Sequence, residues 1–214
     1  MGFLHSGPYG SLNGRTGNNV GRWTKGKNVF SIRPHKSSKK ATQAQLNVRT
    51  KFTLMAEFLV NATTLIDMGF KAYDADMSPM NAAIGYNIQN AVTGVAPNFT
   101  VDYSKIAFSK GNRVAKPSRD GIASITAGYV DFTWEGISVG NKASKLTDKA
   151  NFIVYNPTTN ELVVLEEVVE RSEAEFSLQV PSHFSGDLVH CYMNFVSVEK
   201  RVSNTAYIGQ IVLI

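Results

Sequence analysis

The sequence predicts an α+β protein in which an N-terminal extended arm and a helical hairpin precede an antiparallel β-sandwich. Three observations support this. Residues 1–40 carry a glycine every few positions, and residues 42–68 repeat apolar side chains with the spacing of a helix. Residues 122–213 form short runs of β-type residues separated by turn sequences. We expect two domains, residues 1–110 for the arm, helices and first strand, and residues 111–214 for the sandwich.

The arm is rich in glycine and poor in apolar side chains. Residues 1–40 contain seven of the 17 glycines of the chain, and glycine loses so much conformational freedom on ordering that such a segment does not pack alone. The alternation at 29–32, ended by Pro34, predicts one strand, which could add to an open sheet edge of a neighbour. The rest of the arm is expected to be extended and to lie on another surface.

A long helix is predicted over residues 42–68. Thr42 and Gln45 form a capping box at its start, and Gly69 is placed to end it. Between them, apolar residues recur at intervals of four and three positions, which is typical of one helix face. This apolar stripe consists of Val48, Phe52, Met55, Leu59, Ala62 and Ile66.

A second helix is predicted to start at Ser78 as N-cap, with Pro79 in its first turn and Gly94 as its stop. Its own apolar stripe allows two interpretations. The two helices can pack on each other as a hairpin, or the long stripe can form a coiled coil with a neighbouring copy.

Beyond Pro97 the pattern is that of β-structure. Phe99, Val101 and Tyr103 alternate as in a strand, and residues 111–121 are predicted to be a linker. Seven further strands, with turn residues between them, predict a sandwich. They are expected at 122–126, 130–134, 151–155, 162–168, 174–180, 189–196 and 206–213.

Four stretches near the N-terminus carry a family resemblance: Gly17-Asn18-Asn19-Val20-Gly21, Gly26-Lys27, Ile32-Arg33-Pro34 and Thr42-x-x-Gln45-x-x-x-Arg49-x-Lys51-Phe52. They resemble the start of a Bacteroidota family of unknown function whose members share this length. The C-terminal part resembles a fibronectin type III or immunoglobulin-like sandwich in the placement of Trp134, Val154-Tyr155 and Tyr207. The family has no known activity, so the resemblance implies no catalytic residue.

Charge is distributed unevenly along the chain. Residues 1–60 contain ten Lys and Arg against one acid, Glu57, whereas residues 161–175 are rich in glutamate. Such asymmetry predicts a basic arm that binds nucleic acid, a membrane surface or an acidic protein face. The candidate interaction residues are Arg15, Arg22, Trp23, Lys25, Lys27, Arg33, Lys36, Lys39 and Lys40 in the arm, and Phe52, Met55 and Leu59 in the stripe.

The sequence offers no motif for catalysis or for a cofactor. Residues 21–28 nearly match a P-loop, but Asn28 lacks the hydroxyl that binds magnesium. The single cysteine, Cys191, excludes an internal disulfide, and its neighbour His190 points to the other face of the same predicted strand. The four histidines have no metal-ligand spacing. We therefore expect no enzyme, no metal, no cofactor and no small-molecule substrate.

The function expected is that of a structural protein whose arm and apolar stripe contact neighbouring subunits in a homo-oligomer, a virion or a filament. One alternative is a nucleic-acid- or ribosome-binding protein that uses the arm. A second is a monomeric ligand-binding or adhesive sandwich module. No apolar run approaches the length of a membrane span, and no apolar signal region follows residues 1–6. A cytoplasmic location is expected.

Overall fold

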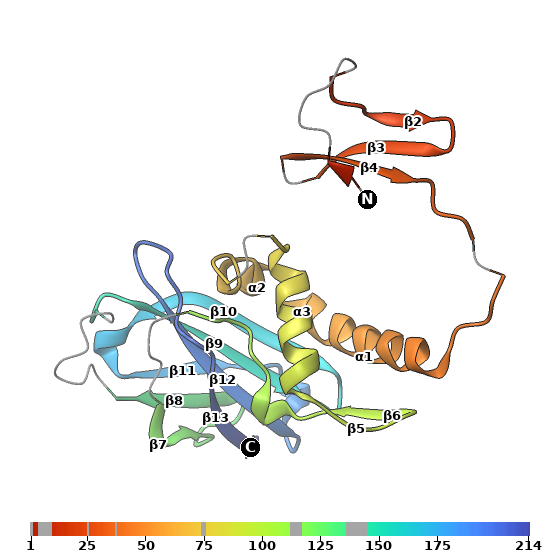
Figure 1. The fold of residues 1–214 in the computed structure, drawn as a ribbon. Coiled ribbons are helices and arrows are strands. Elements are labelled where there is room, and N and C mark those ends of the chain that lie inside the picture. Colours follow the sequence, from red (N-terminus) through yellow and green to blue (C-terminus); the bar gives the residue numbers. More distant parts are fainter. Residues whose placement is uncertain are drawn as a thin grey trace. The chain divides into compact units, whose positions relative to one another are not determined.

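A computed structural model confirms the α+β class (Figure 1). The chain forms two compact units, Met1–Gln43 and Ala44–Ile214. The helices and the sandwich thus belong to one unit, in place of the division expected at residue 110, because they share a core. The residues that the structure describes are 2–3, 10–24, 26–36, 38–73, 76–111, 117–135 and 145–214.

The N-terminal unit contains an antiparallel sheet with the strand order β1-β4-β3-β2. The expected extended arm therefore folds back on itself. Gly17 and Gly26 make this possible, because they have φ angles of 59° and 72° in the tight turns between successive strands. The strands are β1 (Gly2–Phe3), β2 (Gly14–Thr16), β3 (Asn19–Thr24) and β4 (Lys27–Ile32).

The strand predicted at 29–32 is present as part of β4, but it is not free to extend a foreign sheet as expected. It pairs with β3 along its length and with β1 at Val29 and Phe30. A strand with neighbours on both sides has few unpaired backbone groups to offer. Residues 29 and 30 are therefore already paired on both sides in this fold.

The long helix predicted over 42–68 is broken in two. Thr63 Oγ1 donates a hydrogen bond to the Val60 carbonyl at 2.6 Å, and Ala62 has non-helical angles of −113° and 26°. Gly69 does end the second piece. The elements are α1 (Gln43–Leu59), the 3₁₀ turn η1 (Val60–Ala62) and α2 (Thr63–Gly69).

The second predicted helix is α3 (Pro79–Asn90), which packs on α2. Its N-cap is confirmed, since the Ser78 hydroxyl accepts from the Asn81 amide at 3.4 Å. Gly94 is not its stop. It lies instead in a hairpin formed by β5 (Val92–Val95) and β6 (Asn98–Val101). No helix in the described residues combines the length and the apolar character that crossing a membrane requires.

All seven predicted sandwich strands are present, and the first begins inside the expected linker. They form a three-stranded sheet, β11-β8-β7, and a four-stranded sheet, β10-β9-β12-β13, with antiparallel pairs throughout. Three 3₁₀ turns accompany them, η2 (Tyr103–Lys105), η3 (Arg171–Glu173) and η4 (Ser182–Phe184). The strands are β7 (Pro117–Ala123), β8 (Tyr129–Trp134), β9 (Lys149–Asn156), β10 (Glu161–Glu170), β11 (Glu175–Gln179), β12 (Leu188–Val196) and β13 (Ala206–Val212).

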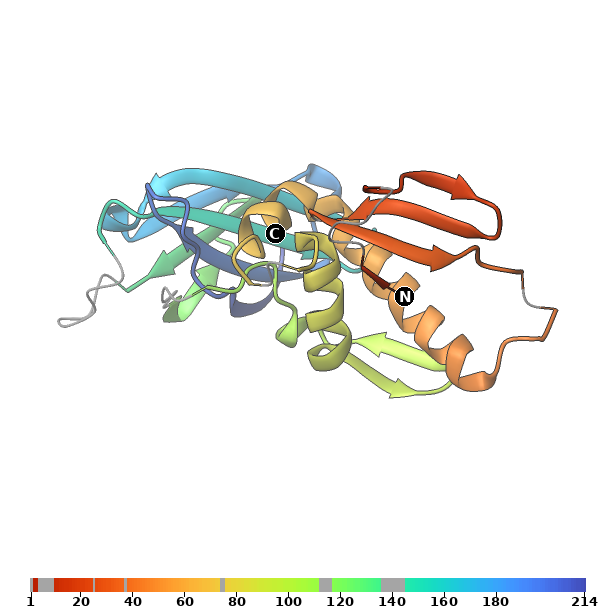
Figure 2. The same ribbon diagram turned by 45° about the horizontal axis from the view of Figure 1, so that its top comes forward.

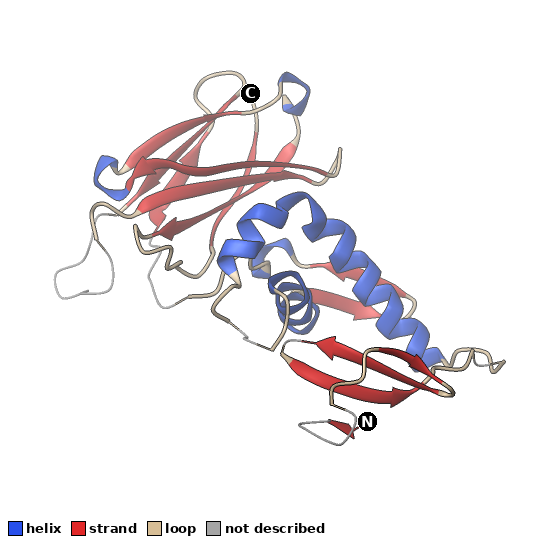
Figure 3. Cartoon of the chain, turned by 90° about the horizontal axis from the view of Figure 1, so that it is seen from above, coloured by secondary structure: helices blue, strands red, loops and turns tan. Residues whose placement is uncertain are grey.

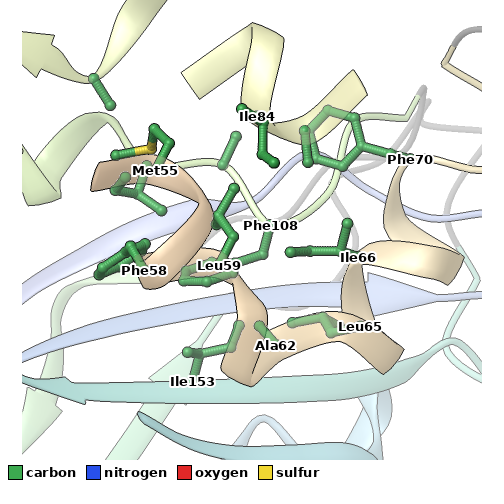
Figure 4. Packing of buried hydrophobic residues seen from close by; sticks show 14 of the residues in the cluster. Met55, Phe58, Leu59, Ala62, Leu65, Ile66, Phe70, Ile84, Phe108 and Ile153 are labelled. Carbon is green, nitrogen blue, oxygen red and sulfur yellow. The ribbon is translucent and has the colours of Figure 1, made fainter. Parts of the chain in front are cut away.

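The four-stranded sheet has a core on each face. Phe152 of β9 points into the space between the two sheets, where its ring stacks on Phe176 at 5.0 Å between centroids. The next residue, Ile153, points to the opposite face and packs among residues of the three helices (Figure 4). Figures 2 and 3 show these helices along one side of the strands. The second unit is therefore a stack of helices, a four-stranded sheet and a three-stranded sheet.

Candidate interaction surfaces

One face of the N-terminal sheet is cationic. The strand register pairs Arg22 with Val29, Arg15 with Val20, and Lys27 with Thr24. Because side chains alternate along a strand, Arg15, Arg22 and Lys27 share one face. All three side chains are exposed, and this set is called the cationic face below.

The opposite face of the sheet is apolar. Trp23, Phe30 and Ile32 lie on it by the same alternation. Trp23 is 55% exposed and Ile32 is 70% exposed, so much of this apolar face is in contact with solvent. The sequence groups Trp23 with Arg22 among the candidate interaction residues, but the sheet places the two side chains on opposite faces.

The N-terminal sheet has little core of its own. Among its described residues only Gly21, Asn28 and Val29 are buried. The backbone of Leu12 crosses this region, because Asn28 Nδ2 donates to the Leu12 carbonyl at 2.9 Å. A Cβ on Gly21 would come within 2.3 Å of the same oxygen, so the crossing requires glycine there. Backbone packing and not apolar burial holds this unit together.

The remaining predicted cations do not lie on the sheet faces. Arg33, Lys36, Lys39 and Lys40 are exposed in the segment between β4 and α1. Lys25 lies outside the described residues.

The apolar stripe of the first helix divides between surface and core. Met55 and Leu59 are fully buried in the chain's own core (Figure 4), so their predicted role as contacts to a neighbour is wrong. Phe52 is 47% exposed, so its contact with a neighbour stays a prediction. Sequence reasoning missed Leu46, which is also exposed, and Val48 is 67% exposed on the same half of α1. Leu46, Val48 and Phe52 are called the exposed half of α1 below.

An acidic edge is formed by β10 and the segment that follows it. Glu161 contacts His183, with 2.6 Å between Oε2 and Nε2, and Glu167 pairs with Lys200. Burial, and next the charge of Glu167, raises the pKa of Glu166. The remaining members, all exposed, are Glu170, Glu173 and Glu175.

The ladder of β10 is interrupted inside this acidic edge. The register to β9 shifts between Leu165 and Val169, and Glu167 between them adopts a left-handed φ of 54°. The Glu167 amide donates to Asn151 Oδ1 at 2.6 Å instead of continuing the ladder. This interruption is a β-bulge in an edge strand.

Two residue groups that the sequence analysis weighed for chemistry, Cys191 and residues 21–28, have the following surroundings in the fold. Cys191 is buried in the sandwich core, where burial raises the pKa of its thiol to about 12. Residues 21–28 lie in the β3–β4 hairpin and not between a strand and a helix, so they lack the geometry of a P-loop. No group of three or more potential metal ligands occurs within the described ranges.

The chain is thus an α+β protein in which a separate basic sheet precedes a helix-covered β-sandwich. It belongs to a family of unknown function (DUF6266), whose model matches residues 11–209. The prediction of a family of unknown function, which rests on the motifs between Gly17 and Phe52, is thereby confirmed. A comparison with curated proteins finds no match.

Proposed function

We propose that the protein is a non-enzymatic structural protein that assembles with further copies of itself through its N-terminal sheet. The observation that carries this proposal is the exposed apolar face of that sheet, with Trp23 and Ile32 largely open to solvent. Units of about 40 residues rarely fold stably alone, and this one buries little. A second surface would supply the missing apolar burial.

Charge favours another copy of the chain as that surface. The unit Met1–Gln43 contains eight Lys and Arg and no Asp or Glu. The acidic edge at β10 and β11 carries the opposite charge and is exposed at Glu161, Glu170, Glu173 and Glu175. Opposite potentials attract and orient two protein surfaces, so the cationic face of one copy would pair with the acidic edge of the next.

The exposed half of α1 would supply the apolar part of the contact. Val48 and Phe52, four positions apart, share one side of α1, and Leu46 adds a further exposed apolar side chain on the same half of the helix. The apolar face of a second copy's sheet would match them in chemistry. Burying apolar area of this kind stabilises an interface by about 25 cal/mol per Å². A filament or virion in the cytoplasm is the class of assembly that such repeated contacts would build.

We also interpret the sandwich as a fibronectin type III or immunoglobulin-like scaffold. Support comes from the two antiparallel sheets of three and four strands and from the buried Trp134, whose Nε1 donates to the Arg171 carbonyl at 2.9 Å. Such sandwiches serve many unrelated functions. The scaffold would hold the acidic edge and α1 in fixed positions.

Removing the apolar face tests the assembly. In the full chain, the double variant Trp23→Ser, Ile32→Ser should lower the native mass from that of a multimer to that of a monomer, because the docking surface becomes polar. Light scattering coupled to size-exclusion chromatography measures this mass. Raising the salt concentration should also dissociate the wild-type multimer, since exposed charge pairs are screened.

The matched control is Ile125→Ser, Val198→Ser. These two residues are 79% and 83% exposed in the second unit, so the control also replaces two exposed apolar side chains by serine, and the multimer should persist. A wild-type protein that is monomeric at every concentration would overturn the proposal. So would a Trp23, Ile32 variant that keeps its mass.

Nucleic-acid binding is a second candidate function, and the cationic face favours it. Arg15, Arg22 and Lys27 on one face could contact phosphates, while Trp23 on the opposite face could not stack on a base held there. The salt dependence of binding to a short oligonucleotide distinguishes this candidate from self-assembly, because phosphate contacts make affinity fall steeply with salt.

A further inference from the structure

A cavity of about 750 Å³ lies in the second unit, and one of its lining residues, Lys200, pairs with Glu167 of the acidic edge. Three segments far apart in the sequence form its walls. They are the end of α2 with the turn that follows it, Lys110 and Gly111, and the loop between β12 and β13. No single stretch of sequence reveals this cavity, because its walls meet only in the fold.

The wall of the cavity is strongly basic. It carries the four cations Lys71, Lys110, Lys200 and Arg201 against the single carboxylate of Glu199. A recess lined by one sign of charge concentrates the electrostatic field and attracts ions of the opposite sign. The cavity therefore favours an anionic ligand.

Contacts within the protein hold three of these cations in place. Lys110 Nζ donates to Tyr86 Oη at 2.9 Å. Lys200 pairs with Glu167, and Arg201 Nε lies 3.5 Å from Glu199 Oε2. Lys71 has no hydrogen bond or ion pair to any residue that the structure describes, so its ammonium group is free to bind a ligand.

The walls of the cavity are joined by polar contacts. The Gly111 amide donates to Asn204 Oδ1 at 3.1 Å, and the Ser109 amide donates to Thr205 Oγ1 at 2.8 Å. A Cβ on Gly111 would approach the Val202 carbonyl to 1.8 Å, so only glycine permits this close approach.

An aromatic ring completes the cavity. Tyr73 packs edge-on against Phe70 and Tyr86, with ring centroids 5.5 Å and 6.0 Å apart. It nevertheless remains 49% exposed at the cavity. A fixed, accessible ring beside cations suits a ligand that carries both a planar group and a negative charge.

We propose that this cavity binds the phosphoryl group of a nucleotide, with Lys71 and Lys110 contacting the phosphate and Tyr73 contacting the base. The ligand would carry both a phosphate ester and a nucleobase. A free nucleotide and a single-stranded nucleic acid both have these groups, and the experiment below distinguishes them.

Titration calorimetry with AMP, at a constant ionic strength set by chloride, tests the proposal on the full chain. Lys71→Ala and Lys110→Ala should each weaken AMP binding about tenfold, because each removes a hydrogen bond to a charged group. Tyr73→Leu should weaken AMP binding while leaving that of inorganic phosphate unchanged. Lys149→Ala, which removes an exposed lysine outside the cavity, is the control and should bind like wild type.

Three outcomes decide the result once circular dichroism confirms that each variant is folded. Binding of AMP that depends on Lys71 supports a free nucleotide. If the protein binds a ten-nucleotide oligo(dT) but not AMP, and this binding depends on Lys71, the ligand is a single-stranded nucleic acid and the proposed phosphate contact is supported. Absence of binding by both probes, or equal binding by wild type and the two lysine variants, overturns the proposal. None of these outcomes depends on the native mass, so self-assembly is judged separately.

Discussion

The side chain of His190 on β12 lies on the face of the four-stranded sheet that the helices cover. Its side chain is 8% exposed, and its Nδ1 lies 3.0 Å from Tyr207 Oη. Its ring centroid lies 4.7 Å from that of Tyr103. The adjacent Cys191 points into the sandwich core on the other face, which the alternation of a strand predicts correctly. Burial lowers the pKa of His190 below its ordinary value of 6.5.

This lowered pKa makes stability depend on pH. Between its ordinary and its lowered pKa, His190 is protonated in the unfolded chain and neutral in the folded one. The free energy of unfolding should therefore have its full value above pH 6.5. It should decrease as the pH drops below 6.5, by at most about 1.4 kcal/mol per pH unit. Urea unfolding at pH 7.5, 6.5 and 5.5 measures the slope.

The variant His190→Gln keeps a polar side chain at this position and cannot titrate. Comparing it with wild type isolates the contribution of His190 from those of the other histidines. If the free energy of unfolding depends on pH equally in the two proteins, the protonation of His190 is the same in the folded and the unfolded chain, and the prediction is wrong.

At the scale of elements, α1 is one helix with two environments. Near its end, Met55, Phe58 and Leu59 are buried in the core, whereas its first half is exposed. The apolar periodicity is the same in both halves. Periodicity therefore locates the apolar face of a helix, but not the part of that face which the rest of the chain covers.

Leu59→Ala and Val48→Ala separate the two environments. Leu59 is completely buried, so its truncation leaves a cavity and should lower the free energy of unfolding by about 2–5 kcal/mol. Val48 is 67% exposed, and its truncation should change that energy by no more than about 0.5 kcal/mol. Urea denaturation measures both, and similar losses for the two variants would contradict this division of α1.

The sequence predicts the sandwich well and the N-terminal sheet poorly, for physical reasons. Each sandwich strand has a buried face, so apolar residues such as Val130 and Phe132 alternate visibly. The N-terminal strands bury little, and alternation is weak there. A hairpin signal was nevertheless present in Gly17-Asn18, a pair typical of tight turns between strands.

The break in the long helix and the basic cavity were hidden for different reasons. The apolar spacing continues through Val60–Ala62, so a local hydrogen bond from Thr63 breaks the helix without a change of pattern. The cavity cations come from positions as distant as Lys71 and Arg201, and only the fold brings them together.

At the scale of the whole molecule, the two cores belong to one cooperative unit. Both contain residues of β9 and β12, one core on each face of the shared sheet. All residues of both cores lie within Ala44–Ile214. The helices and the sandwich should therefore unfold together, and the N-terminal sheet should contribute little to that transition.

A chain that comprises residues 40–214, and so keeps Thr42 before α1, tests this independence. We expect one cooperative urea transition with the midpoint of the full chain, because neither core loses a member. Far-ultraviolet circular dichroism and tryptophan fluorescence from Trp134 should give coincident curves. Loss of cooperative unfolding would show that the N-terminal unit is needed to complete the fold.

The bulge at Glu167 affects whether the edge strand β10 can pair with a strand of another molecule. An uninterrupted outer strand is a template to which a strand from another molecule can be added without limit, which is how amyloid fibrils elongate. In β10 the left-handed residue and the amide turned inward to Asn151 interrupt that template. Neighbouring glutamates add electrostatic repulsion between identical strands. Contacts at the bulge are therefore expected to be made by side chains and not by continuous backbone pairing.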